Sequence, residues 1–242
     1  MIMRPIKSTC LIVCHGNSSD ILEQRIQEFK DFDVEWCSMS HFDVPQEHIL
    51  DKINKKFSIV YDSSTVENEV EYELKVRIPR LVHYLDNSVY NFYICTRSDH
   101  NNLHELRDRL GLNFNKKYND QIVYAESFGI NPNLFDVSLP LYIACLVKMG
   151  ATRIIMFGAD GGGTLGNNPN SYYKPGYVVS DKMVAHNNLN YNMTGDTNNV
   201  NINYNRLMQT VLGFMPTVLN CSPVTRYTVF PVVTYDNVVK ML

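Results

Sequence analysis

The most constraining feature of this 242-residue chain is the segment from Ser138 to Asp160, SLPLYIACLVKMGATRIIMFGAD. Apolar residues with helical spacing lead into Gly150, and a second apolar run then ends at Gly158 and Asp160. A helix followed directly by a strand is half of a βαβ unit, and such strands end at the edge where open α/β sheets bind ligands. The segment therefore predicts a parallel α/β sheet with a carboxylate at its ligand-binding edge.

Similar short apolar runs, each followed by a polar turn, recur along the chain and alternate with helical patterns. We therefore expect residues 1–242 to form one doubly wound, mostly parallel Rossmann-like sheet of about seven strands, with helices on both faces. The predicted strands are Thr9–Cys14, Asp33–Met39, Phe57–Tyr61, Tyr90–Thr96, Gln121–Ala125, Arg153–Gly158 and Thr217–Cys221. The predicted helices are Ser19–Lys30, Val66–Leu85, Asn101–Leu110, Leu134–Met149 and Asn201–Phe214.

One segment, at about 161–200, departs from this alternation because it is rich in Gly, Asn and Tyr. It is far longer than an ordinary loop, and loops of that size are usually lids, binding loops or disordered inserts. A lid, a disordered insert and a small subdomain all fit the composition. The aromatic residues and the apolar patch YVVSDKMVAH favour a lid.

Composition limits the class of protein. The net charge is -3, with 22 Lys and Arg against 25 Asp and Glu, and no basic run is long enough to indicate nucleic-acid binding. No apolar run reaches the roughly 18 residues of a membrane span, and the amino-terminal apolar run is too short for a signal peptide. The cysteines lie singly, mostly in apolar stretches, which is typical of buried thiols in a reduced compartment. A cytoplasmic protein is predicted.

Small polar residues follow several of the predicted strands. The first strand leads into His15-Gly16-Asn17-Ser18-Ser19, the second includes Ser38, and the third ends in Asp62-Ser63. Each set taken alone is explained by capping of the next element, but together they predict one polar crevice at the carboxyl edge of the sheet. No DxD pair ends a strand and no His/Cys/Asp cluster has ligand spacing, so neither a metal nor another cofactor is predicted.

The order of these pieces resembles the bacterial family-42 sialyltransferases and the wider Rossmann-like group that includes pyrophosphokinase-like proteins of archaeal pterin synthesis. The resemblance rests on CHGNSS, FDVEWCSMSHFD, SIVYDSS, YNFYICTRS, the segment from Ser138 to Asp160, VAH and VLNCSP. It implies an enzyme that moves a sugar from a CMP-type donor to a hydroxyl of a glycan or small molecule, without metal. The family also suggests a homo-oligomer.

The resemblance also implies roles for particular residues. His186 would be the general base, and Tyr172 or Tyr173 would donate a hydrogen bond to the departing phosphate. On sequence alone, a solvated loop histidine is the other reading of His186. Residues implied to bind the donor or its nucleotide are Gly16, Asn17, Ser18, Ser38, Asp62, Ser63, Ser138, Gly158, Asp160, Ser222 and Pro223.

Two other functions stay open. An ATP- and Mg²⁺-dependent pyrophosphokinase-like transferase would use Asp62 and Asp160 as metal ligands. A non-catalytic nucleotide-binding relative would explain why Asp62 stands where the sialyltransferases carry Asn.

Overall fold

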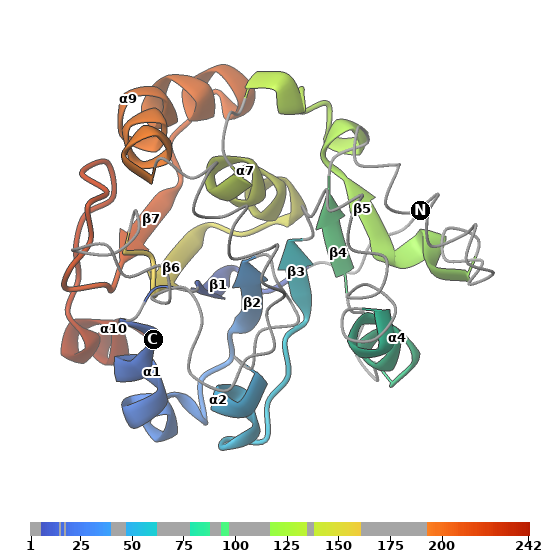
Figure 1. The fold of residues 1–242 in the computed structure, drawn as a ribbon, viewed down its shortest axis with the longest axis vertical. Helices are drawn as coiled ribbons and strands as arrows, with labels where there is room; N and C mark the ends of the chain where they lie inside the picture. Colours follow the sequence, from blue (N-terminus) through green and yellow to red (C-terminus); the bar gives the residue numbers. More distant parts are fainter. Residues whose placement is uncertain are drawn as a thin grey trace.

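The chain folds around one parallel β-sheet (Figure 1). The computed structural model describes residues 6–14, 16, 18–39, 47–61, 78–87, 93–96, 117–134, 138–160 and 193–242. All paired strands run parallel, in the order β5-β4-β3-β2-β1-β6-β7. The expected α/β class with a mostly parallel sheet is confirmed. The strands are β1 (Thr9–Val13), β2 (Glu35–Met39), β3 (Ile59–Tyr61), β4 (Tyr93–Thr96), β5 (Ile122–Tyr124), β6 (Arg153–Phe157) and β7 (Thr217–Asn220).

Strand β1 lies at the point where the strand order reverses. It pairs with β2 on one side, where Val13 is opposite Ser38, and with β6 on the other, where Val13 is opposite Phe157. From β1 the chain adds strands on the β2 side as far as β5, and then returns to place β6 and β7 on the opposite side. The carboxyl ends of β1 and β6 therefore form the topological switch point, the usual ligand-binding position in such sheets.

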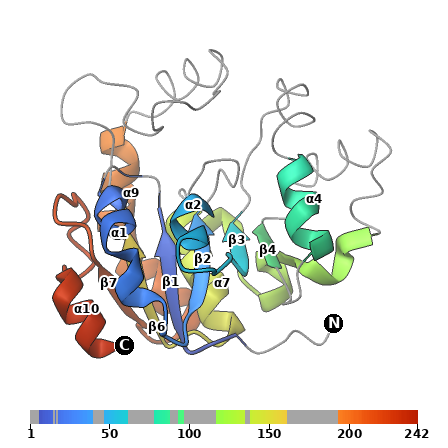
Figure 2. The same cartoon turned by 90° about the horizontal axis from the view of Figure 1, so that it is seen from below.

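Helices cover both faces of the sheet. One face carries α7 (Ser138–Met149) and α9 (Met193–Leu212), whose buried residues belong to one core cluster. Figure 2 shows the opposite face from outside, with α10, α1, α2 and α4 lying across it. Its helices are α1 (Ser19–Arg25), α2 (Glu47–Asp51), α4 (Ile78–Asn87) and α10 (Tyr235–Met241). Short 3-10 turns are η1 (Ile26–Phe29), η4 (Asn119–Gln121), η5 (Ala125–Phe128) and η6 (Pro132–Leu134).

The two cores differ in character. Helix α7 is buried almost all round, as its continuous apolar sequence predicts, and the Tyr142 hydroxyl donates a hydrogen bond of 3.1 Å to the Ile59 carbonyl. On the other face, the fully buried Phe29 ring meets Trp36, Phe157 and Tyr235 edge-to-face. Such aromatic pairs add to the stabilisation that burial alone gives.

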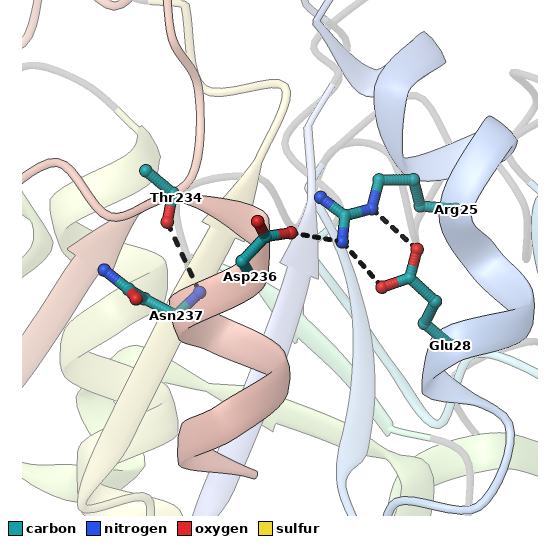
Figure 3. Close-up of polar contacts among 5 residues, drawn as sticks. All are labelled: Arg25, Glu28, Thr234, Asp236 and Asn237. Atoms are coloured by element: carbon teal, nitrogen blue, oxygen red, sulfur yellow. Dashed lines mark hydrogen bonds and ion pairs between the residues drawn. The ribbon is translucent and has the colours of Figure 1, made fainter.

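Helix α10 is held against the first helical segment by an ionic contact (Figure 3). The Arg25 guanidinium donates to Glu28 at 2.7 Å and to Asp236 at 2.6 Å. It also lies 5.3 Å from the centre of the Tyr235 ring. Thr234 caps α10 by accepting a hydrogen bond of 3.3 Å from the Asn237 amide. The carboxyl-terminal helix is therefore fixed to α1 through Arg25, which contacts both Asp236 and Tyr235.

Several predicted boundaries were wrong. Helix α9 begins at Met193, so residues 193–200 are helical although they were assigned to the lid. The start of this helix was missed because its sequence is polar. Its core-facing residues include Val200, Tyr204 and Met208. Helix α7 begins at Ser138 rather than Leu134, with Pro140 in its first turn, where a missing amide costs no helical hydrogen bond. Helices α2 and α10 were not predicted.

Two expectations from composition bear on the described residues. Five cysteines of the chain are buried thiols in this structure: Cys10, Cys14, Cys37, Cys145 and Cys221. Within the same residues, none of the helices combines the length and apolar composition needed to cross a bilayer.

Candidate functional site

Two glycine turns meet at the switch point, just beyond the ends of β1 and β6. The Cys14 amide donates to the Phe157 carbonyl at 2.8 Å, and the Gly16 amide donates to the Gly158 carbonyl at 2.9 Å. Gly158 has a φ of +70°, and a Cβ added there would lie 2.6 Å from the Cys14 carbonyl oxygen. A Cβ on Gly16 would lie 2.5 Å from both Gly158 O and Asp160 Oδ2. Glycine is therefore required at both positions by close backbone approach.

Asp160 lies at the centre of a hydrogen-bonded cluster with Ser18 and Ser222. Both serine hydroxyls donate to Asp160 Oδ1, and the Ser18 amide donates to Oδ2 at 3.1 Å. The two hydroxyl oxygens are 2.9 Å apart. Because Ser18 precedes β6 by more than half the chain, this cluster forms only when β1, β6 and the residues after β7 come together.

Asn220, the last residue of β7, forms hydrogen bonds to the backbone next to this cluster. Its side chain is fully buried, donates to the Ala159 carbonyl at 2.9 Å and to Thr225 Oγ1 at 2.8 Å, and accepts the Ser222 amide at 3.0 Å. Thr225 also donates to the Ala159 carbonyl, at 2.9 Å. Because its amide oxygen and nitrogen are both bonded, Asn220 fixes the position of Ala159, which precedes Asp160, and that of Ser222.

Burial raises the pKa of the two thiols near the cluster, Cys14 and Cys221. Burial, and secondarily the negative charge of Asp160, raises the pKa of the Cys14 thiol far above its usual range. Burial raises the pKa of Cys221 to about 12. Both side chains are therefore neutral thiols at cellular pH and act as small apolar groups, not as nucleophiles.

Within the described residues, hydrogen bonds are what meet the Asp160 carboxylate. Among the described residues, no Lys or Arg side chain pairs with this carboxylate, whose partners are two hydroxyls and one amide. The Ser18 side chain occupies the N-cap position of α1 but makes no capping hydrogen bond. Capping was the simpler explanation of this serine, and the structure replaces it with a tertiary contact to Asp160.

The structure brings some of the predicted site residues together and separates others. Those that lie together at the switch point are Gly16, Ser18, Gly158, Asp160 and Ser222. Pro223 follows Ser222 and is exposed, Ser38 is buried within β2, and Ser138 begins α7 and has no part in the cluster's hydrogen bonds. The predictions for Asn17, Asp62, Ser63, Tyr172, Tyr173 and His186 lie outside the described residues.

Sequence reasoning overlooked Asn220 and Thr225. A clue was available, because an amide side chain at the end of an otherwise apolar strand needs partners if it is buried. Nothing in the sequence indicates that those partners belong to the turn after β6. As to metals, no cluster of three or more His, Cys, Asp or Glu ligands is found in the part of the chain that the structure describes.

Comparison with known proteins adds no further assignment. A scan against models of protein families finds no match to this chain, and a search of curated proteins finds no relative. The case for a function therefore rests on the residues and on their geometry.

Proposed function

We propose that this chain is a nucleotide-sugar-dependent glycosyltransferase of sialyltransferase-like build, with a CMP-type donor. The observation that best supports this is the cluster of Ser18, Asp160 and Ser222 at the switch point of a parallel sheet. Ligands of open α/β sheets bind in the crevice outside this point. Gly16 and Gly158 let the turns after β1 and β6 approach closely, and this approach places the cluster at the crevice.

The proposed reaction is an inverting displacement without metal. The bond from the anomeric carbon to the donor phosphate breaks as the acceptor oxygen bonds to that carbon, and CMP leaves with the electron pair. In this proposal His186 takes the acceptor proton and Tyr172 or Tyr173 donates to the leaving phosphate. The oxocarbenium-like transition state resembles that of glycoside hydrolysis. The acceptor side belongs to the segment after Asp160, which we propose acts as a lid, and the site of action is the cytoplasm.

Ligand-induced stabilisation tests the binding half of the proposal. At one hundred times its dissociation constant, a ligand stabilises the folded state by about 2.7 kcal/mol. For a chain of this size, that corresponds to a rise in melting temperature of roughly 5–11 °C. CMP is expected to produce such a rise at millimolar concentration. If neither CMP nor any other nucleotide produces one, the proposal is wrong.

Donor turnover tests the catalytic half. The purified protein is incubated with CMP-sialic acid and a galactose-terminated glycan, and release of CMP is followed with the product. His186→Ala is expected to reduce kcat by about a hundredfold or more, the usual contribution of a general base. His48→Ala is the matched control, because His48 lies on α2 and its Nε2 contacts Glu23 of α1 at 3.0 Å, where it has no part in the cluster. An equal loss of kcat in both variants would show that His186 is not the general base.

One observation favours a second candidate, the ATP- and Mg²⁺-dependent pyrophosphokinase-like transferase. Asp160 has no Lys or Arg partner among the described residues, so its charge is available to a cation. Stabilisation by ATP that requires Mg²⁺, is absent with CMP, and is lost in Asp160→Asn would select this candidate. Nucleotide binding without turnover of either donor would instead identify a non-catalytic relative.

A further inference from the structure

The two serine hydroxyls and the Ser18 amide at the switch point already donate within the cluster. Ser18 and Ser222 carry one hydroxyl proton each, and both hydroxyls are directed at Asp160 Oδ1. The Ser18 amide is directed at Oδ2. A carboxylate oxygen accepts about two hydrogen bonds. Oδ1 is therefore satisfied, while Oδ2, with one bond from the described residues, keeps room for another.

Burial determines which member of the cluster a ligand can reach. Ser222 is fully buried and Ser18 is nearly so, whereas Asp160 is only half-buried. Gly16 lies against Oδ2 without a side chain, and any larger residue there would displace the carboxylate. Asp160 is therefore the member of the cluster that keeps some exposed surface, and its carboxylate oxygens accept hydrogen bonds.

The negative charge of Asp160 disfavours binding of a phosphate next to it. A phosphate at hydrogen-bond distance from Oδ2 would place two negative groups side by side, and no Lys or Arg side chain of the described residues offsets them. The amide of Ser18 that would otherwise serve an anion already serves Asp160. A neutral group with an O–H or N–H proton has the opposite preference, since hydrogen bonds to an ionised acceptor are about twice as strong as neutral ones.

We infer that Asp160 is a specificity-determining residue that binds a neutral hydrogen-bond donor of the nucleotide, with the phosphate held elsewhere. The donor is a ribose hydroxyl or the exocyclic amino group of the base. This inference rests on the proposed nucleotide site and refines it, because the turn from Gly16 to Ser18 then meets the nucleoside and not its phosphate.

Dissociation constants for a small set of nucleotides test the inference by calorimetry. The probes are CMP, 2′-deoxy-CMP, 3′-deoxy-CMP, UMP and cytidine. For the wild-type protein, loss of the group that binds Asp160 is expected to weaken binding about tenfold to a hundredfold. Weakening with a deoxynucleotide identifies the ribose as the source of the donor, and weakening with UMP identifies the base.

Variants link that effect to Asp160. In Asp160→Asn the discrimination is expected to fall to about threefold to tenfold, because the acceptor becomes neutral. In Asp160→Ala it is expected to disappear, while the ratio of CMP to cytidine affinity stays as in the wild type. Asp31→Asn, which removes the same charge from a side chain that is 86% exposed, is the control and should match the wild type. If Asp160→Ala does not fold, Asp160→Asn alone decides.

The measurements distinguish failure of the inference from failure of the proposed function. If nucleotides bind but Asp160→Asn keeps the full wild-type discrimination, Asp160 does not read the ligand and the inference is wrong while the proposed function stands. If the Asp160 variants alter only the CMP-to-cytidine ratio, the carboxylate acts on the phosphate, which also overturns the inference. If no nucleotide binds the wild type, the proposed function falls and the inference falls with it.

Discussion

Substitution of Gly158 by Ala should show how closely the ends of β1 and β6 approach each other. Gly158 has a φ of +70°, and an added Cβ would lie 2.6 Å from the Cys14 carbonyl oxygen and 3.0 Å from Ser19 Cβ. The carbonyl belongs to backbone, so relief requires movement of the turn after β1. Because the Cys14 amide is bonded to the Phe157 carbonyl, such movement would disturb the site.

Two other glycines isolate this effect from the cost of the backbone angle. Gly129 and Gly213 have φ values of +72° and +70°, and an added Cβ at either meets nothing within 4 Å. Ala at a left-handed angle costs roughly 1–2 kcal/mol, reduced by about 0.4–1 kcal/mol because the unfolded chain loses freedom. Overpacking adds about 1–3 kcal/mol. We expect the Gly158→Ala variant to be about 1–3 kcal/mol less stable than either control variant.

Urea unfolding provides the measurement. Trp36, the single tryptophan, is buried in β2 beside β1 and reports unfolding by fluorescence, with circular dichroism as a second probe. The midpoint and slope give the free energy of unfolding for each variant. If Gly158→Ala lies within about 0.5 kcal/mol of Gly129→Ala and Gly213→Ala, the close approach described above is not present in the molecule.

Other contacts of the molecule can be tested in the same way. Asn220→Ala should lower the free energy of unfolding by about 1–3 kcal/mol, measured in urea, because it leaves buried groups unpaired. Cys14 and Cys221 should resist iodoacetamide in the native protein at pH 8 and react in urea, as mass spectrometry of their peptides will show. Arg25 holds the pKa of Glu28 below its ordinary value of 4.5. This lowered pKa stabilises the fold above pH 4.5, and the contribution disappears as the pH falls through the folded-state pKa. In pH-dependent melting curves the loss should stay below about 1 kcal/mol, because Glu28 is exposed, and should vanish in Arg25→Gln.

Much of the site was predictable because its parts follow strands. The buried runs that form β1 and β6 mark where Gly16 and Asp160 stand, and parallel pairing brings strand ends to one edge. The same rule also grouped Ser38 with them, although it is buried one residue inside β2. Spacing along a strand locates its end only to within a residue or two, and that error moves a side chain from the edge into the core.

The partners within the site were not predictable. Ser18 reads as a helix cap because local hydrogen bonds can be judged from neighbouring residues, whereas its actual partner is 142 positions away. Asn220 shows the same limit, because its three bonding partners come from two separate loops. Helix α10 was missed since only Tyr235 and Val238 among its residues are buried, too few to give a helical period.

The position of β1 between β2 and β6 has a consequence for synthesis on the ribosome. A nascent chain that has emerged only as far as β5 can pair β1 with β2, but the other edge of β1 stays bare until β6 is made. Leu11 and Ile12 of β1 are fully buried in the finished fold, so the incomplete sheet exposes apolar side chains beside unpaired backbone groups. Such an edge can pair with other chains and cause aggregation. Translation past β6 covers this edge and places β1 inside the sheet, so demand for chaperones should be higher before that point than after it.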